Sequence, residues 1–419
     1  MRPILPRPAV VPPLALLAAT AATAPTPDAR AVEGAGGVPS WIVGDPGDAV
    51  VAHEPGLVLA GGGGDVDEAM RWMLERAAGG DVVVIRASGG PGYNDYLFDQ
   101  LGVPVDSVET IVIPDAAAAH DPSVAERILG AEALFIAGGD QTAYVEAWRD
   151  TPVEDAINHL VNEKLAVVGG TSAGMMILGG TWYAPATLGV LSEEALADPY
   201  HPYMETLGHD DFITVPLLAD TVLDTHFGDR DREGRLVAFM ARMETDRGVD
   251  AFAIACDEFT AVVVDGEGRA RVFGEWPAFP DEAFFLRSRC APPASLPEVC
   301  VPGTPLTWDR DDRAVEVHRV PGTVDGDGWF DLTDWTSGDG GTWHAWWVED
   351  GVLLEQPIDG PADCPCPGDL DGSGAVGFED VVALTAAWGG VGPADLDGDG
   401  VVALADLIAL LAAWGPCAG

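Results

Sequence analysis

The chain has 419 residues, of which 47% are hydrophobic, so it can bury a substantial core in two or three domains. Its 68 acidic residues outnumber its 21 basic ones and give a net charge of −47, which excludes electrostatic attraction to nucleic acid or to an anionic membrane. A hydrophobic fraction this high argues against a disordered polyanion, and we therefore expect an acidic globular protein.

The N-terminus has the three regions of a secretory signal peptide. Arg2 and Arg7 come first, the apolar segment "AVVPPLALLAATAA" follows, and Ala-Thr-Ala at 22–24 fits a small-residue cleavage site. We therefore predict a signal peptide over residues 1–24, a lead-in over 25–55, and a secreted or periplasmic protein. No later apolar run reaches the roughly 18 residues that a membrane span needs.

Short apolar runs alternate with amphipathic segments from residue 56 onward. The runs are "GLVLAGGGG", "DVVVIRASGG", "VETIVIPD", "ALFIAGGD" and "LAVVGGTSAG", and they enclose helical patterns such as "VDEAMRWMLERAA". Continuous Val, Ile and Leu runs are typical of strands that are covered on both faces, so this pattern predicts an α/β domain over residues 56–290, with a mostly parallel sheet and flanking helices. Functional residues in such sheets gather beyond the carboxyl ends of the strands.

The pattern changes to β structure after residue 258. "TAVVVDGEGRARVFG" predicts a hairpin, and "HAWWVEDGVLLEQ" predicts another that turns at Asp350-Gly351. We assign residues 291–360 to a small β-rich appendage. Its tryptophans could stack on sugars, although packing within a small β layer is their more common use.

The six cysteines are unevenly placed along the chain. Cys290 and Cys300 flank a Pro-rich loop and could close it with a disulfide, which export would permit. Cys256 lies in the apolar run "AFAIAC", which predicts a buried thiol. The other three cysteines bracket the C-terminal segment, and their pairing stays open; they are Cys364, Cys366 and Cys417.

The C-terminal segment, residues 361–419, contains an internal repeat. "DLDGSGAVGFEDVVALTAAWG" and "DLDGDGVVALADLIALLAAWG" begin 26 residues apart. Each has oxygen-bearing residues at the spacing with which an EF-hand loop wraps calcium, and glycine at the sixth loop position. The residues are Asp369, Asp371, Ser373, Gly374 and Asp380 in the first loop, and Asp395, Asp397, Asp399, Gly400 and Asp406 in the second. The repeat therefore predicts two structural calcium sites.

No helix is predicted before either loop, unlike in an ordinary EF-hand. Loop-then-helix repeats over residues 366–417 resemble a type I dockerin, a calcium-dependent module that docks on cohesin domains of other secreted proteins. The resemblance implies a cohesin-type partner, and cysteines at both ends of the segment could staple it.

A G-x-S-x-G pattern stands at residues 170–174, where the apolar run "KLAVV" gives way to a helical pattern. Glycines on both sides of Ser172 permit a strained elbow that holds the hydroxyl clear of the sheet. We therefore predict Ser172 as a nucleophile, with the backbone N–H of Ala173 directed at a developing oxyanion.

Such a serine needs a base and a group that orients the base. His226 follows the apolar run "TVLDT", and Glu258 follows "AIACD". The chain order is then serine, histidine, acid. An α/β-hydrolase esterase would instead use His318 or His344, and both lie in the predicted appendage.

These residues resemble the cyanophycinase and dipeptidase E-like serine peptidases, which have a class I glutamine amidotransferase-like α/β fold. The motifs "AGGDQ", "GGTSAG", "LDTHFGDRDREGR" and "CDEFTAV" follow the order of that family, over roughly residues 56–290. The resemblance implies Ser172 as nucleophile, His226 as general base and Glu258 as the acid that orients it. It also implies an oxyanion hole from the N–H groups of Gly139 and Ala173, and no catalytic cofactor.

The resemblance further implies a set of substrate-binding residues, namely Gln141, Asp224, Thr225, Arg230, Arg232 and Arg235. Thr225 departs from the family's glutamine, which puts the fine specificity in question. The three arginines precede a predicted helix, where they oppose the helix dipole, so local stability does not explain them. Guanidinium groups would suit the carboxylate of an acidic or β-aspartyl substrate, and the alternative is pairing with the neighbouring acids at 229, 231 and 233 on the surface.

The sequence thus predicts a secreted serine exopeptidase that resembles cyanophycinase and releases β-Asp-Arg dipeptides from cyanophycin, or cleaves related acidic peptides. A non-catalytic binding or assembly module and a secreted esterase are the alternatives. The glycine run at 61–64 lacks the third glycine of a dinucleotide-binding motif, so we expect no nucleotide cofactor. We expect no nucleic-acid partner, and a homodimer stays open.

Overall fold

The computed structural model describes residues 2–3, 30–33, 37–186, 188–205, 207–290, 295–362, 366, 368–373, 375–397 and 399–416. Apart from Arg2 and Pro3, the predicted signal peptide lies outside these residues, as do Cys364, Cys417 and Gly374. Within the described chain, no helix combines the length and the apolar character that crossing a bilayer requires.

The first sheet contains eleven strands among the described residues, and its centre is parallel. In spatial order they are β18 (Gly338–Asp339), β17 (Trp329–Asp331), β14 (Arg269–Trp276), β13 (Ala261–Asp265), β4 (Gly56–Ala60), β8 (Val167–Thr171), β7 (Ala133–Ile136), β5 (Asp81–Arg86), β6 (Ser107–Val112), β3 (Pro39–Gly44) and β2 (Arg30–Glu33). The five predicted strands from β4 to β6 are parallel to one another, and their carboxyl ends share one edge. The strands on either side of this group are antiparallel.

The second sheet contains nine strands in the described part of the chain. Its order is β1 (Arg2–Pro3), β20 (Val352–Ile358), β19 (Thr342–Glu349), β16 (Val315–Pro321), β15 (Glu282–Ser288), β12 (Phe252–Cys256), β11 (Thr221–Thr225), β9 (Thr181–Tyr183) and β10 (Leu207–His209). Only β9, β11 and β12 form parallel pairs among these strands.

Two expectations about the architecture are therefore wrong. The sheets are mixed rather than mostly parallel, because hairpins extend both of them in the antiparallel sense. The segment 291–360 is not a separate appendage, since β16 pairs with β15 over seven residues and β17 pairs with β14. The lead-in also joins the domain, through β3 against β6. Each added strand covers backbone groups that an exposed sheet edge would leave unpaired.

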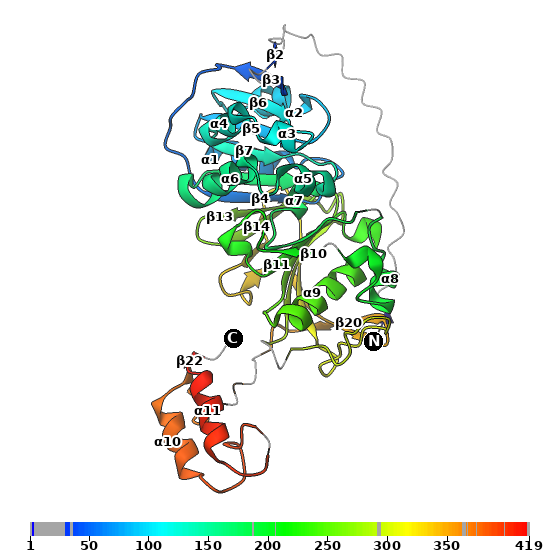
Figure 1. Cartoon of the computed structure of the whole chain (residues 1–419), viewed down its shortest axis with the longest axis vertical. Helices are drawn as coiled ribbons and strands as arrows, with labels where there is room; N and C mark the ends of the chain where they lie inside the picture. Colours follow the sequence, from blue (N-terminus) through cyan, green and yellow to red (C-terminus); the bar gives the residue numbers. More distant parts are fainter. Residues whose placement is uncertain are drawn as a thin grey trace.

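Helices cover the faces of the two sheets (Figure 1). They are α1 (Asp67–Arg76), α2 (Gly92–Asp95), α3 (Ala116–Ala119), α4 (Pro122–Gly130), α5 (Gln141–Trp148), α6 (Pro152–His159), α7 (Ala173–Met176), α8 (Ser192–Ala197) and α9 (Glu233–Arg247), with single turns η1 (Tyr96–Gln100), η2 (Leu160–Lys164), η3 (Pro202–Met204), η4 (Pro216–Leu218) and η5 (Gly228–Arg230). α4 and α6 begin with proline after Asp121 and Thr151, whose side chains accept a hydrogen bond from the first turn.

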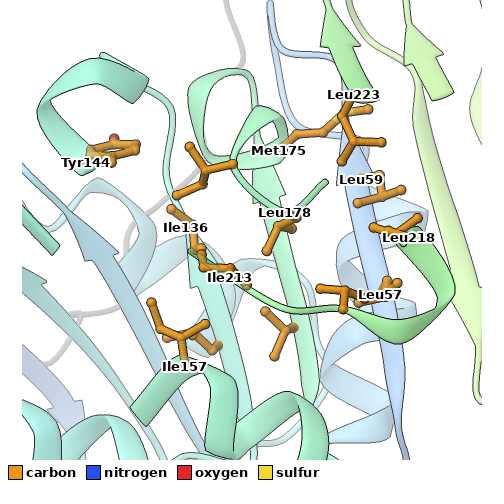
Figure 2. Packing of buried hydrophobic residues seen from close by; sticks show 14 of the residues in the cluster. Leu57, Leu59, Ile136, Tyr144, Ile157, Met175, Leu178, Ile213, Leu218 and Leu223 are labelled. Carbon is orange, nitrogen blue, oxygen red and sulfur yellow. The ribbon is translucent and has the colours of Figure 1, made fainter. Parts of the chain in front are cut away.

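A shared hydrophobic core joins the two sheets. Figure 2 shows Leu59 of β4, Met175 of α7 and Leu223 of β11 gathered in this core, and all three are buried. The tryptophans at 308, 346 and 347 are also almost wholly buried, so they pack in the interior rather than form a sugar-stacking surface. Cys256 is a buried thiol, as predicted, and Cys300 is also a buried thiol, so no disulfide links it to Cys290.

The C-terminal segment has a small core of its own. The helices α10 (Phe378–Ala386) and α11 (Leu404–Ala412) each follow their loop, and the short strands β21 (Ala375–Val376) and β22 (Gly415–Pro416) pair. Val376, Leu384, Val402 and Leu410 are buried together, at positions that repeat every 26 residues. Cys366 is disulfide-bonded.

Candidate active site

Ser172 lies on a sharp turn between β8 and α7, as the sequence predicts. Its φ of 52° and ψ of −118° are unusual for a residue with a side chain, and such strain is common at functional positions. The turn is packed tightly, since a Cβ atom on Gly174 would lie 2.1 Å from the carbonyl oxygen of Ile136. Only glycine fits there, so the motif's second glycine lets α7 approach β7.

Ser172, His226 and Glu258 form a continuous hydrogen-bonded chain. The Oγ of Ser172 is 2.8 Å from Nε2 of His226, and Nδ1 of His226 is 2.5 Å from Oε1 of Glu258. The serine comes from the first sheet, whereas the other two residues follow β11 and β12 of the second sheet. The arrangement can transfer a proton from the hydroxyl to the imidazole while the carboxylate holds the ring.

The surroundings of His226 favour its neutral form. Its pKa lies below the ordinary value chiefly because the ring is buried; the hydrogen bond to Glu258 opposes this effect, while the charges of Arg230 and Arg232 add to it. The residue is only 6% exposed and has a positive φ of 48°. A neutral imidazole near neutral pH is ready to accept a proton.

Two further carboxylates hold the loops that carry the histidine and the acid. Asp229 accepts a hydrogen bond from the backbone N–H of Glu258 at 3.0 Å, and Asp257 accepts one from the N–H of Gly228 at 2.7 Å. These bonds tie the loop after β11 to the loop after β12. The sequence gives no signal for this role of Asp229, because the two loops are distant along the chain.

The loop after β7 lies beside the serine. A Cβ atom on Gly138 would be 3.5 Å from the Cβ of Ser172, so the peptide that carries the N–H of Gly139 is close to the hydroxyl. Ala173 is the first residue of α7, directly after the serine. Both predicted oxyanion donors therefore lie near Ser172. Gln141 is the first residue of α5 on the same loop and is half-buried.

Arg232 and Arg235, two of the predicted substrate-binding arginines, are engaged with Asp224 in this structure. Arg235 donates to both oxygens of Asp224, at 2.7 and 2.6 Å, and Arg232 donates to Asp224 at 3.2 Å and to the carbonyl of Thr225 at 2.7 Å. Asp224 and Thr225 are 0% exposed and Arg235 is 4% exposed. These residues form an internal ion-pair network beneath the turn of His226, because a buried carboxylate needs compensating donors.

The positive charges in this network keep the carboxyl group of Asp224 ionised. Burial alone would raise its pKa, but the charges of Arg235 and Arg232 outweigh burial and hold the pKa below the usual value. Of the three arginines, only Arg230 keeps an exposed side chain, at 52%, and it lies 3.9 Å from Glu258. Arg232 and Arg235 therefore pair with Asp224 and not with the neighbouring acids at 229, 231 and 233.

The glycine run at 61–64 lines the site, a role that the sequence analysis did not predict. The carbonyl of Gly61 accepts a hydrogen bond from the N–H of His226 at 3.0 Å. A Cβ atom on Gly62 would lie 2.6 Å from Cε1 of His226, and one on Gly63 would lie 2.8 Å from Oε2 of Glu258. The sequence does contain a feature that could have predicted this role, because four glycines follow a strand at the functional edge of the sheet.

The esterase alternative has no geometric support. Ser172 is hydrogen-bonded to His226, whereas His318 is buried in β16 and packs against Phe330 with ring centroids 5.6 Å apart. His344 lies in β19, which is separated from the strand of His226 by three other strands.

Part of the chain matches a known peptidase family. Residues 93–272 match the model of peptidase family S51, and this range includes Ser172, His226 and Glu258. The match and the geometry around the serine support a serine peptidase. The fold and the site are thus both consistent with the serine peptidase that the sequence predicts.

Curated proteins that are similar to this chain are named cyanophycinases. The cyanophycinase of Synechococcus elongatus is 28% identical over 228 residues, which cover 52% of this chain and 66% of that protein. That of Trichormus variabilis is 28% identical over 180 residues, with 43% and 54% covered, and that of Geminocystis herdmanii is 25% identical over 179 residues, with 43% and 59% covered. The chain thus spans between about half and two thirds of the length of these curated relatives.

Two solved structures also resemble part of the chain. A peptidase from an acI-B1 actinobacterium has a TM-score of 0.39 and 18% identity, covering 54% of this chain and 89% of its own. A putative peptidase E from Listeria monocytogenes has a TM-score of 0.33 and 13% identity, covering 53% and 99%. At such scores these structures add nothing to the fold described above.

Proposed function

We propose that this chain is a secreted serine exopeptidase that hydrolyses β-aspartyl or other acidic peptides, with cyanophycin as one substrate and β-Asp-Arg dipeptides as its product. The observation that carries the proposal is the hydrogen-bonded chain from Ser172 through His226 to Glu258, with bonds of 2.8 and 2.5 Å. The cyanophycinase relatives support the substrate class. Export rests on the charged, apolar and small-residue regions of the N-terminus.

The proposed reaction is acyl transfer to serine followed by hydrolysis. The Oγ of Ser172 forms a bond to the scissile carbonyl carbon while its proton passes to Nε2 of His226. His226 then donates this proton to the leaving amine as the C–N bond breaks. Water, deprotonated by the same imidazole, cleaves the ester and regenerates the hydroxyl. Glu258 accepts the Nδ1–H hydrogen bond and stabilises the imidazolium.

The oxyanion that forms in both steps needs backbone donors. Ala173 and Gly139 are the candidates, because one directly follows the serine and the other belongs to the peptide beside it. The depressed pKa of His226 leaves the base unprotonated at neutral pH, which this mechanism requires.

The test of this function uses the purified chain, cyanophycin, and matched peptides with α- and β-linked aspartate. Mass spectrometry of the products should show dipeptides released from chain ends, and a fluorophosphonate probe should label Ser172 in the wild type but not in Ser172→Ala. Absence of both labelling and hydrolysis would establish the non-catalytic alternative. Turnover of acyl esters without any peptide would favour the esterase.

For the C-terminal segment, we propose calcium-dependent docking on a cohesin-type protein. The carboxylates of Asp369, Asp371 and Asp380 lie within 4.8 Å of one another, as do those of Asp395, Asp397 and Asp399. Such oxygen clusters suit a hard cation, which would neutralise their mutual repulsion and hold each loop against its helix. Ser373 and Asp406 would complete the two ligand sets.

The surface of this segment favours a protein partner. Phe378, Val382 and Trp388 are exposed along the first helix and the turn after it, and the residues 26 positions later are exposed as well, namely Leu404, Ile408 and Trp414. Large apolar groups in exposed rows mark interaction surfaces rather than stable solvent-facing helices. A partner that covers either row would bury several of them at once.

A further inference from the structure

A cavity of about 360 Å³ lies at the functional edge of the first sheet, apart from the triad residues. Its walls are Asp65, Asp67, Arg86, Gly92, Tyr93 and Tyr96. The two acids follow β4, Arg86 is the last residue of β5, and the others belong to the segment after β5. β4, β5 and the serine-bearing β8 all end at this edge, so the cavity and Ser172 open from the same side of the sheet.

The register of the strands gives the spacing between Arg86 and the serine. Ile85 of β5 pairs with Ile136 of β7, which pairs with Gly170 of β8, so Arg86 is level with the residue before Ser172. Two inter-strand steps of about 4.8 Å each separate the strand ends by roughly 10 Å. An extended peptide covers that distance in about three residues.

Shared neighbours connect the cavity to the triad on both sides. The loop from Gly61 to Asp67 touches His226 and Glu258 with its glycines and lines the cavity with its two acids. On the other side, the charge of Arg86 opposes the rise that burial causes in the pKa of Tyr144. The hydroxyl of Tyr144 would lie 2.5 Å from a Cβ on Gly139.

Arg86 is held in place without a carboxylate. Its Nε donates to the carbonyl of Ser88 at 2.5 Å and its Nη1 donates to that of Gly90 at 3.2 Å. Among the described residues, no acidic oxygen forms an ion pair with this guanidinium, although the chain has 68 acids and only 21 bases. Carbonyl groups thus orient the side chain while its positive charge stays available.

The acids in the cavity are already engaged with the tyrosines. Tyr93 donates to Asp65 at 3.1 Å and Tyr96 donates to Asp67 at 2.8 Å. These bonds fix both phenol rings as the walls around Arg86. The two carboxylates also limit the negative charge that the cavity tolerates, so a ligand with one carboxylate fits better than a dianion.

We propose that this cavity is a substrate subsite in which Arg86 binds a carboxylate of the peptide, within about three residues of the scissile bond. The inference rests on the proposed peptidase function and names the residue that recognises the carboxylate of the substrate. It adds Arg86 to the predicted substrate-binding arginines, of which Arg232 and Arg235 also pair with Asp224.

The kinetic test compares two β-aspartyl peptides that differ only in a free carboxylate or a carboxamide about three residues from the scissile bond. Arg86→Gln should lower kcat/KM for the carboxylate peptide by about 10- to 100-fold and leave the carboxamide peptide nearly unchanged, because a charge-assisted hydrogen bond is lost. Arg86→Lys should retain part of the preference. Arg76→Gln is the matched control, since Arg76 also bonds a backbone carbonyl, at 3.2 Å from that of Pro55, at the opposite edge of the sheet.

A binding measurement separates this inference from the proposed function. Calorimetry with Ser172→Ala and with Ser172→Ala/Arg86→Gln should show tighter binding of the carboxylate peptide only when Arg86 is present. If the wild type cleaves peptides and the Arg86 variants lose no preference in kinetics or binding, the subsite is refuted and the peptidase stands. If Ser172 proves inert but binding still depends on Arg86, the peptidase fails and the subsite stands.

Discussion

Arg235 binds Asp224 through two parallel hydrogen bonds of 2.7 and 2.6 Å at a position closed to solvent. The pair joins β11 to α9, the strand and helix that flank the turn of His226, so it supports that turn from beneath. A buried charge that loses its partner costs far more than a surface ion pair.

Loss of this pair should therefore reduce stability more than substrate binding. We expect Asp224→Asn or Arg235→Met to lower the free energy of unfolding by about 3–5 kcal/mol, measured with urea, because either change leaves a buried charge or donor unpaired. The pKa of Asp224 is depressed in the folded state, so its contribution is complete above its unfolded pKa and disappears as the pH falls through the folded value. A large rise in KM at unchanged stability would restore the substrate-binding interpretation.

The three residues of the hydrogen-bonded chain should act as one unit. Ser172→Ala and His226→Ala should each lower kcat by about 10⁴-fold or more, and the double variant should lose little beyond either single one. Glu258→Gln should have a smaller effect, since the amide still contacts Nδ1 but cannot stabilise the imidazolium. Peptide turnover with circular dichroism as the folding control gives the result, and full activity of Glu258→Gln would move the orienting role to another group.

The pH profile should reflect the environment of His226. Only the neutral imidazole can accept the serine proton, and its pKa is below 6.5, so kcat/KM should rise with pH and reach half its plateau below pH 6.5. The charge of Arg230 contributes to this depression. Arg230→Ala should therefore shift the midpoint upward, most clearly at low salt, and a midpoint that stays in place would show that the charge of Arg230 does not lower this pKa.

Glu244 should make the stability of the fold depend on pH near neutrality. Burial raises its pKa to about 7, against the weaker lowering effect of Ser288 and Ser295. A raised carboxyl pKa means that stability is complete below the unfolded pKa and is lost as the pH rises through about 7. Glu244→Gln should remove this dependence and raise the free energy of unfolding at pH 8 by roughly 2–3 kcal/mol. Parallel pH–stability curves for the two proteins would contradict this assignment.

Calcium should order the C-terminal segment and leave catalysis untouched. In the full chain, calorimetry should detect calcium binding that Asp371→Asn and Asp397→Asn each weaken, since each change removes one carboxylate from a loop. A chelator should lower protection of α10 and α11 against proteolysis, while peptide turnover stays the same. Unchanged heats in both variants would refute the calcium sites.

The predicted parts of the site are those that follow from local sequence. An apolar run, a glycine-flanked serine and a helical pattern suffice to predict the elbow at Ser172, because its strain depends on neighbouring residues. His226 and Glu258 are predictable as residues that follow strands. The parallel centre from β4 to β6 is predictable for the same reason, since each strand has its own apolar run.

The wrong predictions concern contacts between distant segments. Nothing in the sequence shows that Asp224 points inward and takes Arg232 and Arg235 as partners, because alternation along β11 does not reveal which face a polar group joins. The pairing of β15 with β16 is equally invisible, and it converts the supposed appendage into part of the second sheet. The sequence gives no signal for the cavity at Arg86, because its walls come from the separate segments that follow β4 and β5.

The hydroxyl and the imidazole of the active site come from different sheets, and their distance depends on the shared core around Leu59, Met175 and Leu223 and on the backbone bond from His226 to Gly61. A displacement of about 1 Å between reacting groups can cost a hundredfold in rate. The rate of peptide turnover should therefore be a sensitive measure of how well the two sheets pack against each other. Heat, pressure or a cavity-forming substitution in that core should abolish activity before any helix or strand unfolds.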